Sequence, residues 1–189
     1  MGVKIAFVIY DGMTTLDFIG VYDPVTRLRT MGFVPDLTWD VCGPSDEILD
    51  GSGLRILPRS VYPILGAYTM VVVPGGPSAR EFVGDEGFIE WLRTALPCKL
   101  KASVCTGSLL LGAAGFLHHK RAATHPSARG LLAPYCAEVS EERIVDDGDV
   151  ITAGGVSSSI DLGLYLCEKL ADADARRRIA KQMDYPYGP

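Results

Sequence analysis

A chain of 189 residues with 48% hydrophobic and 22% charged residues has the composition of a globular protein, and its length suits a single domain over residues 1–189. The net charge of −5 at pH 7 gives no electrostatic case for binding nucleic acid or an anionic membrane, and no apolar run approaches the roughly 20 residues that a membrane helix needs. The N-terminal residues lack the features of a secretory signal, so we expect a cytoplasmic protein.

Short apolar runs typical of strands alternate along the chain with helical patterns. The expected strands are 3–10, 37–43, 69–76 and 100–105, followed by a hairpin over 143–155 with Gly148 in its turn. The expected helices are 16–30, 88–96, 108–117 and 160–182. Several strands lack strict polar alternation, which favours strands that are covered on both faces. The pattern therefore predicts an α/β fold, a mostly parallel sheet with helices on both faces.

Three loops follow predicted strands directly: DGMTTLD (11–17), PGGPS (74–78) and CTGS (105–108). In open α/β sheets, ligands bind beyond the carboxyl ends of the strands. We therefore expect these three loops to converge at one crevice that takes a small-molecule substrate.

The cysteines offer one candidate nucleophile. Their odd number, their wide spacing and the lack of a C-x-x-C pair disfavour a disulfide framework, and with only three histidines in the chain we expect no metal and no cofactor. Cys105 differs from the others because it stands between a predicted strand and the start of a helix, with Gly107 in the turn. This placement resembles a nucleophile elbow, and the helix N-terminus is expected to lower the pKa of the thiol. The other four are Cys42, Cys98, Cys136 and Cys167, which we interpret as packing or loop residues.

Backbone N–H groups near Cys105 are candidates for binding a developing negative charge. The glycines of VVVPGGPSA, Gly75 and Gly76, follow a buried strand and can aim their N–H groups at a ligand. We expect the N–H groups of Gly76 and Thr106 to form the anion-binding pair. The alternative for Pro-Gly-Gly is a plain turn that ends a strand.

Asp17 and His125 are the candidate partners of the cysteine. Asp17 lies among apolar residues at the beginning of a predicted helix, where it either complements the helix N-terminus or acts as general acid/base toward Cys105. His125 precedes a proline in the loop after the cysteine helix. It is a possible auxiliary residue of the site, and a capping or surface role is the alternative.

The segments TTLDFIG, VVVPGG, SVCTGSLLLGAAGFL, RAATHP and ITAGGVSSSIDLGLYL together resemble the ThiJ/PfpI superfamily over nearly the whole chain. The resemblance implies a flavodoxin-like three-layer sandwich, a cysteine on a nucleophile elbow and a homodimer. Within the superfamily, the combination of Asp17 with C-T-G is most similar to the isocyanide hydratase branch.

At several positions this chain differs from the other branches of the superfamily, which disfavours those branches. Protease-like members have a histidine after the cysteine where this chain has Thr106, and deglycase or glyoxalase members have a glutamate at the position of Asp17. The H-x-E motif of glutamine amidotransferases does not occur. The T-H-P segment at 124–126, however, resembles the deglycase branch and keeps a role of His125 open.

The resemblance implies that the protein adds water to an isocyanide to give an N-formamide. Cys105 would attack the terminal carbon, Asp17 would deliver a proton and then activate water, and the Thr106 hydroxyl would help to hold that water. We expect Phe18, Ile19 and a dimer partner to line an apolar pocket. The alternatives are glyoxalase or deglycase activity on 2-oxoaldehydes and a non-enzymatic redox sensor in which Cys105 is oxidised.

Overall fold

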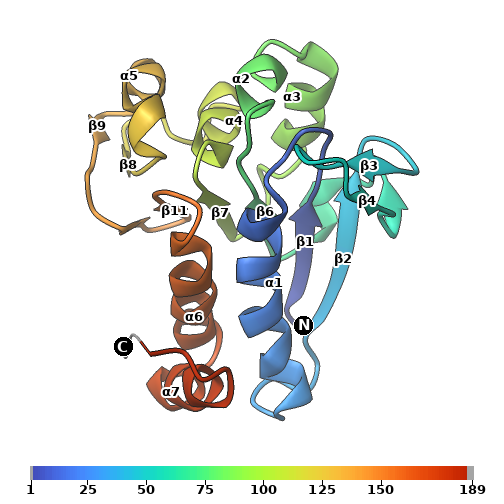
Figure 1. Cartoon of the computed structure of the whole chain (residues 1–189), viewed down its shortest axis with the longest axis vertical. Coiled ribbons are helices and arrows are strands. Elements are labelled where there is room, and N and C mark those ends of the chain that lie inside the picture. Colours follow the sequence, from blue (N-terminus) through green and yellow to red (C-terminus); the bar gives the residue numbers. More distant parts are fainter. Residues whose placement is uncertain (1, 187–189) are drawn as a thin grey trace.

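The computed structural model of the protein describes residues 2–186, and a seven-stranded sheet forms the centre of this part of the chain (Figure 1). The strand order is β10–β11–β7–β6–β1–β2–β5. Neighbouring strands are parallel except β10 and β11, which form the predicted hairpin. The strands are β1 (Lys4–Val8), β2 (Thr38–Gly43), β5 (Ser60–Val61), β6 (Met70–Val73), β7 (Leu100–Val104), β10 (Ile144–Asp147) and β11 (Val150–Ala153).

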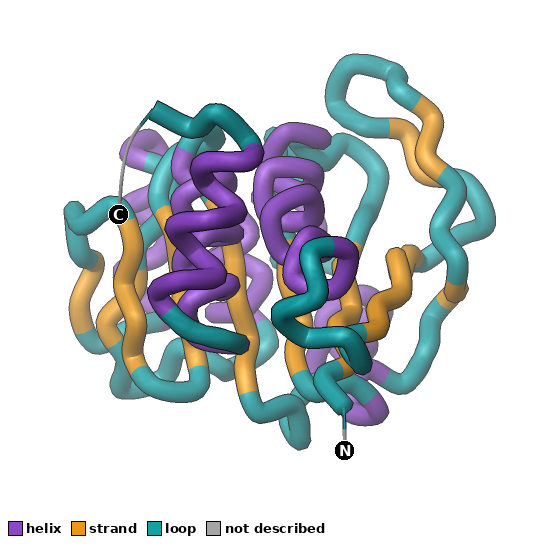
Figure 2. Tube along the Cα trace, turned by 90° about the horizontal axis from the view of Figure 1, so that it is seen from below, coloured by secondary structure: helices purple, strands orange, loops and turns teal. Residues whose placement is uncertain are grey.

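Helices cover both faces of this sheet, so the predicted α/β sandwich is confirmed (Figure 2). The α-helices are α1 (Thr15–Thr30), α2 (Ala79–Phe82), α3 (Glu86–Arg93), α4 (Gly107–Ala113), α5 (Arg129–Leu132), α6 (Ser158–Leu170) and α7 (Ala173–Gln182). Two small two-stranded sheets lie outside the main one: β3 (Ile48–Leu49) with β4 (Arg55–Ile56), and β8 (Arg121–Ala122) with β9 (Glu138–Val139). No helix within the described range is long and apolar enough to span a membrane.

Phe7 of β1 and Tyr10, which follows this strand, show how the two faces of the sheet are filled. Phe7 packs against Tyr22 of α1, with ring centroids 5.1 Å apart. Tyr10, which points to the other face, packs against Phe88 of α3 at 5.4 Å. The side chains of Phe7 and Tyr10 are both fully buried, which explains why this segment shows no alternation of apolar and polar residues.

Close packing of α1 against α6 fixes the position of the first helix. A Cβ atom at Gly20 would lie 2.0 Å from Ser159 Oγ, and one at Gly163 would lie 2.5 Å from Pro24 Cγ. Only glycine allows the two backbones to approach so closely at these points. The contact holds the start of α1, and with it Asp17, in a defined place beside the sheet.

The prediction of one helix over 160–182 is wrong, because this segment forms two helices. The chain leaves the helical conformation at Ala171, and Asp172 begins α7 by accepting a hydrogen bond from the Ala175 N–H at 2.8 Å. The short strands β3, β4, β5, β8 and β9 are also absent from the predicted elements. Strands of two residues are too short to carry a periodic pattern, and their tertiary contacts define them.

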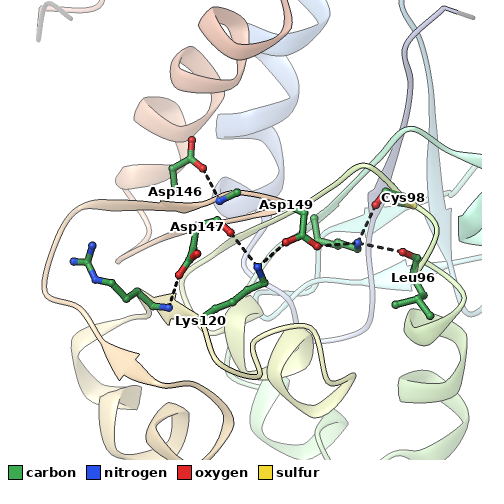
Figure 3. Close-up of polar contacts among 9 residues, drawn as sticks. Leu96, Cys98, Lys120, Asp146, Asp147 and Asp149 are labelled. Atoms are coloured by element: carbon green, nitrogen blue, oxygen red, sulfur yellow. Dashed lines mark hydrogen bonds and ion pairs between the residues drawn. The ribbon is translucent and has the colours of Figure 1, made fainter.

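A buried lysine anchors the end of β7 that lies opposite Cys105, and Figure 3 labels its partners Leu96, Cys98 and Asp149. Lys101 is 3% exposed, and its ammonium donates hydrogen bonds to the carbonyls of Cys98 at 2.8 Å and Leu96 at 3.2 Å. The carboxylate of Asp149 lies 3.5 Å from the same ammonium and 2.6 Å from that of Lys120. These contacts tie the turn between β10 and β11 to the loop that precedes β7.

We expect Lys101→Ala to lower the free energy of unfolding by about 2–4 kcal/mol, because two buried carbonyls lose their donor and the lysine stem leaves a cavity. Lys101→Met keeps the stem and should lose less. Urea denaturation measures both, with the exposed Lys181→Ala as control. Equal effects of Lys101→Ala and Lys181→Ala would show that the buried ammonium contributes nothing.

Candidate active site

Cys105 occupies the sharp turn between β7 and α4, in the left-handed region with φ of 55°. This conformation is costly for a residue with a side chain, so its surroundings must hold it. The Cys105 N–H donates to the carbonyls of Ala153 at 3.0 Å and Gly154 at 2.8 Å. Its carbonyl accepts from the hydroxyls of Ser108 and Thr124, at 3.1 and 3.0 Å. The turn therefore presents the sulfur from a fixed backbone.

The three loops predicted to converge do so at the carboxyl ends of the adjacent strands β1, β6 and β7. The Thr14 N–H donates to the Gly75 carbonyl at 2.8 Å, and the Tyr10 hydroxyl donates to the Pro74 carbonyl at 3.0 Å. A Cβ atom at Gly75 would lie 2.5 Å from the Thr106 nitrogen. The Pro-Gly-Gly loop therefore lies directly against the turn that carries Cys105, which requires glycine at position 75.

Asp17 is completely buried in the first turn of α1. Its Oδ2 accepts a hydrogen bond from the Gly75 N–H at 2.9 Å, whereas no described group forms a hydrogen bond with Oδ1. Burial raises the pKa of this carboxyl to about 7, although the Gly75 N–H and the Cys105 thiol both favour the charged form. One oxygen of the carboxylate is thus fixed, and the other is available for proton transfer near neutral pH.

The prediction of a lowered pKa for Cys105 is wrong for the free protein. Burial raises the pKa of the thiol to about 11, and the negative charge of Asp17 acts in the same direction. The N–H and hydroxyl of Thr106 oppose this effect but do not overcome it. Cys105 is only 5% exposed, so solvent does little to stabilise a thiolate. The resting cysteine is a protonated thiol next to a carboxyl that titrates near neutrality.

Thr106 connects the turn to the glycine loop. Its hydroxyl donates to the Gly76 carbonyl and accepts from the Gly76 N–H, both at 2.9 Å. The N–H groups of Gly75 and Gly76 are therefore already engaged, by Asp17 and Thr106 respectively. This corrects the expectation that Gly76 offers a free N–H to an anion: the two glycines instead position the carboxylate and the threonine.

Thr106→Val should destabilise the fold by about 1–3 kcal/mol, since the buried N–H and carbonyl of Gly76 lose their partner. Thr106→Ser keeps the hydroxyl and should stay within about 1 kcal/mol of the wild type. Denaturant unfolding of both variants tests this. If valine and serine gave equal stabilities, the hydroxyl bridge would not be a stabilising contact.

A cavity of about 210 Å³ reaches Cys105. It is lined by Thr14, Gly76, Pro77, Arg80, Cys105, Thr106, His125, Ser127 and Val156. Asp17 is not among the lining residues, and Gly75 connects it to the loop that lies against the Cys105 turn. Another hollow of about 490 Å³, beside α3, has no cysteine, serine or histidine in its lining. The smaller cavity is therefore the candidate substrate site.

The lining differs from the apolar pocket expected from the sequence. Phe18 is buried against Phe7 in the core, and Ile19 is 41% exposed; neither reaches the cavity. His125 does line it, but its Nδ1 contacts the Ser127 hydroxyl at 2.8 Å. Arg80 and Ser127 were missed, because no local pattern indicates that α2 and the loop after Thr124 meet at this cavity.

The structure therefore defines the chain as an α/β protein with a mostly parallel sheet, a cysteine on a strained strand-to-helix turn, and a buried carboxyl held by the adjacent glycine loop. The chain belongs to the DJ-1/PfpI family, whose model matches residues 3–169.

Individual relatives agree with this assignment. The isonitrile hydratase of Pseudomonas putida is 32% identical over 190 residues, covering 100% of this chain and 81% of that protein. The glutathione-independent glyoxalase DJ-1 of Schizosaccharomyces pombe is 25% identical over 122 residues, or 63% of each chain. Among solved structures, a ThiJ/PfpI family protein from Pseudomonas syringae superposes with a TM-score of 0.89 at 29% identity, covering 100% of this chain and 77% of that one.

Proposed function

We propose that the protein hydrates isocyanides to N-formamides, with Cys105 as the nucleophile and Asp17 as the general acid/base. The observation that carries the proposal is a buried carboxyl, Asp17, that has one oxygen without a hydrogen-bond partner and is held by the Gly75 N–H, in the loop that lies against the Cys105 turn. The similarity to an isonitrile hydratase over the full length of this chain supports the choice of substrate class.

In the first step, the sulfur of Cys105 bonds to the terminal carbon of the isocyanide. Because the resting cysteine is a thiol, its proton must leave as the bond forms, and Asp17 accepts it and passes it to the same carbon. The product is a thioimidate, in which the former isocyanide carbon carries one hydrogen, the sulfur and a double bond to nitrogen. The thiol proton is conserved in this step, and no oxidant or cofactor is needed.

In the second step, water adds to the thioimidate carbon. Asp17 accepts a proton from the water and passes it to the nitrogen, which gives a tetrahedral intermediate with one hydroxyl group. That hydroxyl then gives its proton to Asp17, a carbon–oxygen double bond forms, and the carbon–sulfur bond breaks. The formamide leaves, and the sulfur recovers its proton from Asp17. Gly75 contributes by holding the carboxyl through its N–H, and Thr106 contributes the N–H and hydroxyl that favour negative charge on the sulfur. His125 is assigned no proton transfer.

Glyoxalase activity on 2-oxoaldehydes is the second candidate. It is favoured by the similarity to the fission yeast glyoxalase DJ-1 and by the position of His125 in the lining of the cavity. The redox-sensor alternative is less well supported, because oxidation by peroxide requires a thiolate, whereas the pKa of Cys105 is raised to about 11.

The remaining expectations stay predictions: a single domain over residues 1–189, a cytoplasmic location and a homodimer. For the homodimer, a supporting observation is that α1 exposes Leu16 and Ile19, at 48% and 41%, on either side of Asp17.

The experiment that tests the proposal incubates the purified protein with an alkyl isocyanide and, separately, with methylglyoxal. We expect N-formamide from the isocyanide, detected by chromatography and mass spectrometry. If the protein consumes methylglyoxal but forms no formamide from the isocyanide, the hydratase proposal is wrong and the glyoxalase candidate takes its place. Selective oxidation of Cys105 by peroxide, with neither substrate consumed, would favour the sensor.

A further inference from the structure

Arg80 is the one charged side chain among the described residues that line the Cys105 cavity. It belongs to α2, the short helix that follows the Pro-Gly-Gly loop. Its Nη2 donates to the Ser127 hydroxyl at 3.1 Å, and Ser127 in turn contacts His125. Within residues 2–186 no carboxylate lies within ion-pair distance of the Arg80 guanidinium. A cation with a neutral partner therefore stands at the opening of the candidate active site.

The other arginines of the protein show how unusual this is. Arg29 lies over the ring of Trp39, 5.9 Å from its centroid. The others form ion pairs with aspartate or glutamate: Arg27, Arg55, Arg59, Arg93, Arg121, Arg129, Arg143, Arg176, Arg177 and Arg178. Arg80 alone among the described arginines has neither kind of partner, and it is the one beside the nucleophile.

The cavity suits an anionic ligand in charge as well as in size. None of its lining residues is acidic, and the guanidinium can donate hydrogen bonds to an anion. The planar guanidinium matches a carboxylate in a two-bond arrangement that an ammonium group cannot reproduce. A volume of about 210 Å³ limits the ligand to a small molecule, whose reactive end and charged end both lie inside the cavity.

We propose that the preferred substrates are small isocyanides that carry a carboxylate, which Arg80 binds while Cys105 attacks the isocyanide carbon. This inference rests on the proposed hydratase function for its reaction, and it adds the chemical class of the substrate. In this arrangement Arg80 is a specificity-determining residue, and it takes no part in proton transfer.

Turnover of isocyanoacetate and its neutral methyl ester at pH 8 tests the specificity. The two compounds share the reactive group and differ in the charge of the carboxyl group. We expect the wild type to favour the acid by about tenfold or more in kcat/KM, which is the range of a charge-assisted hydrogen bond. In Arg80→Gln the ratio of kcat/KM for the acid to kcat/KM for the ester should fall toward one, mainly through a higher KM for the acid. Arg80→Lys should restore part of this ratio.

Arg177→Gln, on the distant surface helix α7, is the matched control and should keep the wild-type ratio. An equal ratio in the wild type and in Arg80→Gln overturns the inference while leaving the hydratase proposal intact.

A binding measurement separates failure of this inference from failure of the proposed function. Calorimetry with Cys105→Ala, which cannot form the covalent adduct, compares the two ligands without turnover. We expect the acid to bind more tightly than the ester, and Arg80→Gln in the same background to remove the difference. If the wild type hydrates neither compound, the proposed function fails, and this comparison still decides whether Arg80 binds the carboxylate. Equal binding of acid and ester overturns the inference.

Discussion

We expect Cys105→Ala to remove formamide production while the protein stays folded. We expect the rate to fall by at least about 10⁴-fold, because the covalent route to the thioimidate no longer exists and the carboxyl alone offers no nucleophile. The fold should persist, since four backbone and hydroxyl contacts hold the turn and alanine keeps all of them. The rate of formamide formation and the circular dichroism spectrum measure the two effects.

Cys136→Ala is the matched control, because Cys136 is a half-buried thiol that does not line the cavity. Its activity should stay within about twofold of the wild type. With the wild type and a slow substrate, mass spectrometry should also show an adduct on the peptide that contains Cys105. Formamide production by Cys105→Ala at more than a few per cent of the wild-type rate would mean that Asp17 directs water to the isocyanide without a covalent intermediate.

Asp17→Asn should lower kcat by about 10²–10⁴-fold, the usual contribution of a general acid/base. The pH dependence gives a more specific signature. In the proposed mechanism Asp17 accepts the proton of Cys105 only when it is ionised, and its pKa is raised to about 7. The wild-type kcat/KM should therefore rise as the pH increases from 5 to 8, with an inflection near 7. In Asp17→Asn this inflection should disappear, because the amide does not titrate.

His125→Gln is the control for this assignment, because histidines commonly titrate in the same pH range and His125 lines the cavity. We expect this variant to keep the inflection. If instead the inflection persists in Asp17→Asn and vanishes in His125→Gln, the histidine is the base and the proposed mechanism is wrong.

The sequence predicts correctly those features of the fold that are determined by short, continuous segments of the chain. The apolar runs gave the central strands because residues such as Phe7 and Tyr10 are buried on opposite faces of the sheet. The turn at Cys105 was predictable because a strand, a cysteine and a glycine precede a helical pattern without a break. The convergence of three loops followed from the parallel arrangement of the strands.

The features that could not be predicted depend on contacts between distant segments. The pKa of Cys105 is raised by its burial and by the charge of Asp17. Both effects come from residues that are distant from Cys105 in the sequence. The N–H of Gly75 faces Asp17, 58 positions away, which a local pattern cannot specify. Arg80 lies at the cavity only because α2 meets the loop that carries Ser127.

The burial of Asp17 lowers the stability of the folded protein at the pH values where this carboxyl is ionised. The pKa in the folded state is raised from 3.8 to about 7, so the folded protein favours the neutral form. The free energy of unfolding that this raised pKa contributes is fully present below about pH 4, and it is lost as the pH rises through 7. At 1.36 kcal/mol for each pKa unit, this amounts to roughly 4 kcal/mol at pH 8.

This cost has a consequence for engineering the protein. Selection for heat resistance alone would reward the loss of Asp17, because an uncharged side chain in the same place removes the penalty. Under the proposed mechanism, the survivors of such a screen would include well-folded variants without catalytic activity. A search for a more robust catalyst must therefore select for turnover at every round, or keep position 17 constant and seek its gains elsewhere in the chain.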